Sequence, residues 1–207
     1  MKRMQWGSGL AGVALAALAL TGCSTAEPGQ AAVVGDARIP ESAIADQMRS
    51  VNELAGRPAE EPSAELARTL VSYNLGYELI AQTAAELQVS IPRSQSDQVY
   101  DQQVQQLGGE EQLQQAAAQQ GIPPQSLRRD LETQLLASAI ANRLAPGGQQ
   151  QAAQAALLEK VREVSSRIGV EVAPKYGVWD PEQLQLVPNP DPVARPAVEP
   201  GPVIPAP

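Results

Sequence analysis

The chain has 207 residues, no histidine, one cysteine, and 23 acidic against 15 basic side chains, which give a formal charge of −8. Without histidine there is no Ser-His-Asp or Cys-His catalysis and no imidazole metal site, and one cysteine permits no intrachain disulfide, zinc cluster or CxxC redox pair. An acidic chain also lacks the basic surface that nucleic-acid binding requires, so we expect neither an enzyme nor a nucleic-acid partner.

The first residues have the features of an export signal. Lys2 and Arg3 precede an apolar run, residues 10–20, that contains only Leu, Ala, Val and Gly and leads into Thr21-Gly22-Cys23. A charged start, a short apolar core and small residues before a cleavage site are typical of secretory signals. The run is shorter than the roughly 20 residues that a membrane span needs. The alternative is a short apolar segment with an incidental cysteine.

The position of Cys23 directly after Leu-Thr-Gly resembles the bacterial lipobox. This resemblance implies attachment of a lipid to the Cys23 thiol, cleavage after Gly22 and acylation of the new N-terminus. Two or more acyl chains would anchor the protein firmly, because each buried methylene contributes about 0.8 kcal/mol. We therefore expect residues 1–22 to be a lipoprotein signal peptide and the mature chain to be extracytoplasmic. Which bacterial membrane holds the anchor is left open.

The mature chain divides into a tether, a folded body and a tail. Residues 23–30 are short and polar and form the expected tether. Nine of the 18 prolines lie between Pro181 and Pro207, and proline removes backbone donors and restricts φ. We predict that residues 181–207 form a disordered or polyproline-II tail, which is either a linker or a ligand for a proline-binding partner. The folded domain is expected to cover residues 31–180.

Apolar residues at spacings of three and four predict about six helices between Pro40 and Gly169. Prolines and glycines mark where one helix stops and the next begins, most clearly at Pro92, at Gly108-Gly109 and at Pro146-Gly147-Gly148. The apolar positions of the six helices are Ile44, Met48, Val51 and Ala55; Leu66, Leu70, Tyr73, Tyr77, Ile80, Ala84 and Leu87; Tyr100, Val104 and Leu107; Leu113, Ala116 and Ala117; Leu127, Leu131, Leu135, Ile140 and Leu144; and Leu157, Val161, Val164 and Ile168.

Two short β-branched segments at opposite ends of the helical body predict strands. Residues 31–34 precede Gly35, and residues 170–172 lead toward Trp179. An isolated strand cannot satisfy its own backbone donors and acceptors, so we expect the two segments to pair. The predicted fold class is therefore mainly α, with a short two-stranded sheet that joins the N- and C-terminal segments.

The order of these segments resembles the N-terminal chaperone domain of SurA-type and PrsA-type proteins. The residues that carry the resemblance are Val33-Val34-Gly35-Asp36 before the helix at Pro40, the long helix 70–89, the connection 88–92, the segments 107–113, 120–122 and 127–131, and the returning segment 170–179 with its motif at residues 176–180. The resemblance implies a SurA-N-like chaperone domain over residues 31–180. SurA and PrsA carry parvulin domains before the last helix, whereas only a Pro-Gly-Gly loop stands at residues 145–151. Parvulins also use paired histidines, so no isomerase activity is implied.

On this resemblance, the protein would bind unfolded or partly folded exported polypeptides as an ATP-independent chaperone, with no metal, cofactor or small-molecule substrate. The alternatives are a dedicated interaction lipoprotein in cell-envelope assembly and, third, a peptidyl-prolyl isomerase. Adaptable client surfaces use methionine and aromatic side chains. The candidates for client contact are Met48, Tyr73, Tyr77, Tyr100 and Trp179. Core packing is the alternative for each of them, and the helical pattern favours it for Tyr73 and Tyr77.

Overall fold

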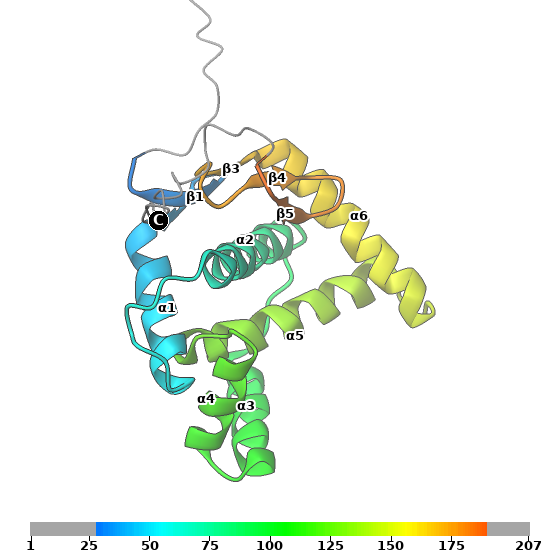
Figure 1. Cartoon of the computed structure of the whole chain (residues 1–207). Coiled ribbons are helices and arrows are strands. Elements are labelled where there is room, and N and C mark those ends of the chain that lie inside the picture. Colours follow the sequence, from blue (N-terminus) through cyan, green and yellow to red (C-terminus); the bar gives the residue numbers. More distant parts are fainter. Residues whose placement is uncertain (1–27, 190–207) are drawn as a thin grey trace, which may run out of the picture.

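The structure, a computed structural model, describes residues 28–189. Helices account for most of these residues, and two small antiparallel sheets close this part of the chain at one end (Figure 1). Cys23, the expected signal peptide and residues 190–207 of the expected tail lie outside this range. Within it are α1 (Glu41–Leu54), α2 (Ala64–Glu86), α3 (Arg93–Leu107), α4 (Glu110–Gln119), α5 (Leu127–Leu144) and α6 (Gln150–Ile168). The prediction of a mainly α fold with about six helices is confirmed.

Two helix boundaries fall at Pro92 and Gly108, as the sequence predicts, and a side-chain cap that is not among the sequence predictions begins α2. The side chain of Ser63 caps α2 by accepting a 3.1 Å hydrogen bond from the main-chain N–H of Leu66. Pro92 precedes the first residue of α3. Gly108 ends α3 with a φ of +87°, a left-handed conformation that glycine adopts without steric cost. These local signals separate α3 from α4 and let the two helices pack against each other as a pair.

The first sheet joins the two ends of the helical body, as predicted, but it has three strands instead of two. β1 (Gln30–Val34) lies between β2 (Ala37–Pro40) and β3 (Val170–Val172), and both pairings are antiparallel. The predicted pairing of β1 with β3 is confirmed. The sequence predicts only a turn, and no strand, between Gly35 and α1. Gly35, with a φ of +56°, reverses the chain there, and burial of Ile39 in the core holds β2 beside β1.

A second sheet places part of the expected tail inside the folded body. β4 (Val178–Asp180) and β5 (Gln185–Val187) form an antiparallel hairpin, so the predicted domain boundary at residue 180 falls inside it. Leu184 and Leu186 pack against the main core. The sequence prediction missed this hairpin because it treated residues 181–207 as one proline-rich tail. Residues 182–187 contain no proline, so they can form a strand.

The core is divided into a large cluster and a small one. The large cluster surrounds α2, which lies beneath the sheets with α1 and α6 on its flanks and α5 below it (Figure 1). Its fully buried side chains include Leu70, Leu75, Leu79 and Ile140, and burial of each contributes about 1.5–3 kcal/mol. The small cluster consists of Tyr100, Leu113, Ala117, Leu127 and Leu131. It holds the α3–α4 pair against α5, at the end of the molecule that lies farthest from the sheets (Figure 1).

Candidate functional site

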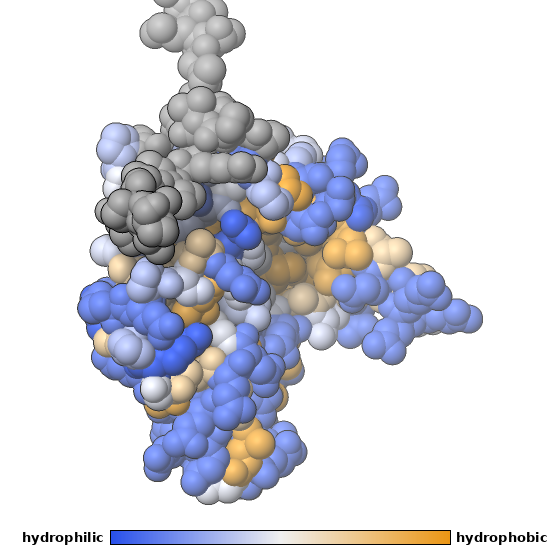
Figure 2. Space-filling model, in the orientation of Figure 1, coloured by the Kyte–Doolittle hydropathy of each residue, from blue (hydrophilic) through white to orange (hydrophobic). Residues whose placement is uncertain are grey.

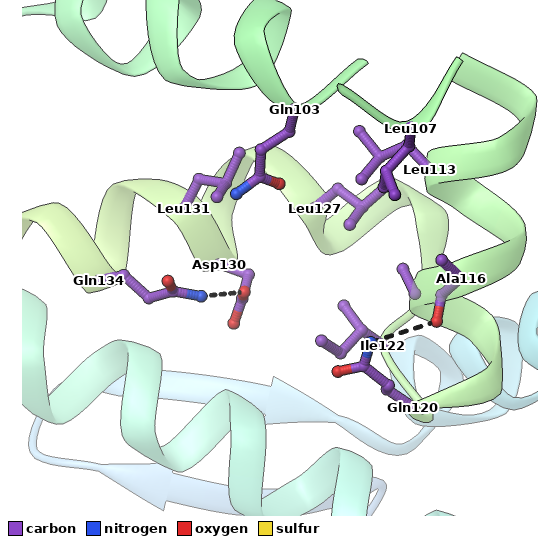
Figure 3. Close-up of a pocket in the computed structure, with 11 residues that line it drawn as sticks. Gln103, Leu107, Leu113, Ala116, Gln120, Ile122, Leu127, Asp130, Leu131 and Gln134 are labelled. Carbon is purple, nitrogen blue, oxygen red and sulfur yellow. Dashed lines mark hydrogen bonds between the residues drawn. The ribbon is translucent and has the colours of Figure 1, made fainter. Parts of the chain in front are cut away.

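A pocket of about 230 Å³ opens between α3, α4 and α5 beside the small core (Figure 3). We call it the α3–α5 pocket. The described residues that line it are Gln103, Leu107, Leu113, Ala116, Ala117, Gln120, Ile122, Leu127, Asp130, Leu131 and Gln134. Leucine and alanine side chains form its floor, and glutamine side chains stand around it. The pocket is therefore an incompletely filled part of the small core that opens to the surface.

Local sequence explains why space remains at this position. Ala116 and Ala117 place only methyl groups on the α4 wall, opposite the larger side chains of α5. Leu127 and Leu131 form that opposite wall and are each 5% exposed, so this side of the pocket is apolar. Leu107 stands in the last turn of α3, before Gly108, and is 46% exposed. A leucine that is half exposed at a pocket mouth adds apolar area that folding does not cover.

Three glutamines give the pocket rim polar groups that carry no charge. Gln103 projects from α3 into the space between Leu127 and Leu131 (Figure 3). The Nε2 of Gln134 donates a 2.7 Å hydrogen bond to Oδ2 of Asp130, and that of Gln120 donates one of 3.4 Å to the carbonyl of Ala116. A primary amide contains both donors and an acceptor. The rim can therefore bind either the N–H or the C=O groups of a polypeptide main chain.

Asp130 is the one charged side chain among the described residues that line the pocket, and both of its oxygens have donors. Oδ2 accepts from Gln134, and Oδ1 accepts a 3.2 Å hydrogen bond from the phenol of Tyr77. Burial, together with this carboxylate, raises the pKa of the Tyr77 phenol well above its usual value, so the phenol remains a donor. Asp130 keeps its negative charge, and the rest of the lining consists of apolar and amide side chains.

Two of the predicted client contacts are core residues. Tyr77 is 5% exposed and Tyr100 is 6% exposed. The phenol of Tyr100 donates a 2.9 Å hydrogen bond to Oε1 of Glu110, and the guanidinium of Arg128 lies 3.9 Å from its ring centroid. Both rings are covered by their neighbours, so they are not exposed contacts for a client. Core packing, the alternative reading of these residues, describes them correctly.

The other three candidates are partly buried and lie on separate elements. Met48 of α1 packs against the main core. Tyr73 of α2 stacks on Tyr77 with ring centroids 6.4 Å apart. Trp179 of β4 also packs against the main core, and its Nε1 donates to Oγ of Ser165 at 2.9 Å. None of the three lines the α3–α5 pocket. A leucine beside a Gly-Gly pair is the one signal in the sequence that points to the pocket.

Apolar surface is divided into separate areas instead of one continuous face. Figure 2 shows an apolar patch on the projecting α3–α4 end and others near the hairpin and α6, with hydrophilic surface between them. The large apolar side chains most exposed in the described range are Leu107, Leu158 and Val178. Between residues 28 and 189 no helix is long and apolar enough to cross a bilayer, and no cluster of acidic side chains is arranged to hold a metal ion.

The α3–α5 pocket is thus a candidate binding site, with an apolar floor and amide groups on its rim. The resemblance to SurA-type chaperone domains stays a prediction. No protein-family model, no curated protein and no solved structure matches this chain.

Proposed function

We propose that this protein is a membrane-anchored extracytoplasmic lipoprotein that binds unfolded or partly folded exported polypeptides as an ATP-independent chaperone. The export signal and the lipid anchor of this proposal are inferred from the sequence around Cys23. The α3–α5 pocket, with its leucine floor and its rim of uncharged amides, is the observation that carries the binding function. Cys23 is the lipidation residue of this proposal, and no catalytic group, metal or cofactor enters it.

The pocket suits weak binding of many sequences. A client leucine or valine that entered it would contact Leu113, Leu127 and Leu131, and full burial of such a side chain contributes about 1.5–3 kcal/mol. Lost translational and rotational freedom offsets much of that gain, so a single pocket gives low affinity. Glutamine amides bind the main chain, which is common to all clients. Low affinity allows release without ATP.

The position of the pocket also agrees with a tethered chaperone. The described chain starts at the sheet end, immediately before β1, and the α3–α4 pair lies at the opposite end (Figure 1). A lipid on Cys23 would attach seven residues before Gln30, the first residue of β1. The anchor would therefore hold the sheet end near the membrane and leave the pocket directed away from it, where exported chains are accessible.

A matched pair of leucine variants tests this proposal. The soluble chain that begins at Ser24 should suppress the aggregation of denatured clients, measured by light scattering. Leu107→Gln should weaken this suppression, because Leu107 lines the pocket and its exposure makes the change cheap for folding. Leu158→Gln removes an exposed leucine of α6 and serves as the control. The proposal is wrong if several unrelated clients aggregate unhindered at several-fold molar excess of the chain.

A dedicated interaction lipoprotein is the second candidate, and the small size of the pocket favours it. A pocket of about 230 Å³ has room for one large side chain and would also suit one partner that always inserts the same residue. Co-purification of the membrane-anchored chain distinguishes the two functions. One stoichiometric partner, lost in the Leu107→Gln variant, would support the scaffold, and many substoichiometric polypeptides would support the chaperone.

A further inference from the structure

A second concavity, of about 330 Å³, lies between β3 and the β4–β5 hairpin, and we call it the β3–β4 groove. The described residues that line it are Val170, Glu171, Val172, Pro174, Gly177, Val178, Trp179 and Asn189. Five of these side chains are aliphatic, prolyl or aromatic. Val178 is 44% exposed here, so the groove leaves apolar area uncovered by the described chain.

We propose that this groove binds the proline-rich segment of the same chain, residues 190–207. The proposal is independent of the chaperone function, because the groove shares no lining residue with the α3–α5 pocket. It assigns an intramolecular binding site to a segment that the sequence leaves as either a linker or a ligand for a proline-binding partner.

Chain connectivity brings this segment to the groove. Asn189 lines the groove and donates from Nδ2 to the carbonyl of Pro174 at 3.5 Å. The next 18 residues, 190–207, include seven prolines. In polyproline-II conformation, at about 3.1 Å per residue, the first six residues of this segment, 190–195, would span about 19 Å. The segment therefore begins at the groove and needs no connecting loop to enter it.

The groove offers what a proline-rich chain binds. Such chains dock on grooves with aromatic and aliphatic walls, because the preformed polyproline-II helix loses little entropy on binding. Trp179 supplies the aromatic wall, and its hydrogen bond to Ser165 fixes the orientation of the indole. Pro174 and Val178, which both precede Trp179 in the sequence, add a flat and a branched apolar surface to the groove.

The edge of β3 adds main-chain donors. At the two ends of the β1–β3 pairing, Ala173 N bonds to Ala31 O at 2.9 Å and Gly35 N bonds to Gly169 O at 3.1 Å. Bonded and non-bonded positions alternate in an antiparallel pair, so the main-chain groups of Val170 and Val172 face away from β1. A proline-rich segment presents carbonyl acceptors to such N–H groups. Its seven prolines lack the N–H donors that would recruit a further strand.

One pair of opposite charges sets the register. Glu171 is the single charged side chain among the groove residues of the described chain, and Arg195 is the single basic residue in 190–207. Arg195 follows Asn189 by six residues, within the span estimated above. An interaction between Glu171 and Arg195 would lay residues 190–195 along the groove beside Trp179.

The test uses the soluble chain from Ser24 to Pro207, in which Trp179 is the only tryptophan because Trp6 lies in the expected signal peptide. Glu171→Lys and Arg195→Glu should each shift Trp179 emission to the red and increase its quenching by acrylamide. The double charge reversal should restore both values. Glu182→Lys, which changes a carboxylate of the hairpin outside the groove, should leave them unchanged.

Arg195→Glu keeps the proposal falsifiable even if Glu171→Lys disturbs β3, because Arg195 belongs to none of the described elements. The proposal is overturned if Arg195→Glu leaves both the emission and the quenching unchanged. It is also overturned if the shielding of Trp179 disappears on dilution, since that result would assign the bound segment to a second copy of the chain.

Discussion

The indole Nε1 of Trp179 donates a 2.9 Å hydrogen bond to Oγ of Ser165 and so joins strand β4 to helix α6. Ser165 is 1% exposed, and the indole packs against the main core. A buried donor or acceptor that loses its partner costs about 1–3 kcal/mol. This one bond therefore ties the C-terminal hairpin to the helical body and orients the aromatic wall of the β3–β4 groove.

Replacement of Ser165 by alanine should loosen the hairpin. The variant leaves the indole N–H without its partner, so we expect the free energy of unfolding to fall by about 1–2 kcal/mol and Trp179 emission to shift to the red. Urea unfolding followed by fluorescence measures both. Ser166→Ala, at the exposed neighbouring position, should change neither value. Equal stability of the two variants would show that the bond contributes nothing to folding.

Asn52 should be one of the most sensitive polar positions. It is 1% exposed, and its Nδ2 donates to the carbonyls of Ala59 and Glu61 at 3.3 and 3.0 Å, which holds the loop between α1 and α2. Asn52→Ala removes both bonds and leaves two carbonyls unpaired, so a loss of about 2–3 kcal/mol is expected in urea unfolding. Asn142→Ala on the exposed face of α5 is the control. If Asn52→Ala lowers the free energy of unfolding no more than Asn142→Ala does, the two hydrogen bonds of Asn52 do not stabilise the loop.

The fold should lose stability in alkali through Tyr77. Burial first, and then the Asp130 carboxylate, raise the pKa of this phenol in the folded state. The phenol of the unfolded chain ionises near pH 10, so this contribution is complete below about pH 10 and is lost as pH rises toward the higher folded pKa. Tyr77→Phe should flatten the alkaline decline in the free energy of unfolding.

The same variant should cost about 1 kcal/mol near neutral pH, because it removes the hydrogen bond to Asp130. Tyr73→Phe, four residues earlier on α2, should keep the alkaline decline of the unaltered chain. Urea unfolding at a series of pH values between about 8 and 11 distinguishes the variants. An unchanged slope in Tyr77→Phe would assign the decline to other groups.

Cys23→Ser should abolish lipidation. The hydroxyl cannot form the thioether that the lipobox resemblance implies, so metabolically supplied labelled palmitate should no longer enter the protein. Ser24→Ala, at the next position, should retain the label. Incorporation of palmitate into the Cys23→Ser chain would disprove the assignment of the anchor, while leaving the proposals for the pocket and the groove untouched.

The sequence alone was sufficient for the helices and for one strand pairing. Pro92 and Gly108 border α3 because proline and glycine act on the backbone within one or two residues, whatever the tertiary context. The pairing of β1 with β3 follows from the need of each strand for a partner. Both inferences depend on local or general constraints, and the structure confirms them.

Only the tertiary structure decided which side chains are available for binding. Tyr77 and Trp179 are both aromatic residues in apolar patterns, yet packing covers the first and leaves the second at the edge of a groove. The β4–β5 hairpin exists because Leu184 and Leu186 find a core surface to pack on. The α3–α5 pocket arises from how three helices meet around small alanines, and such space between elements depends on their relative placement, which no single segment encodes.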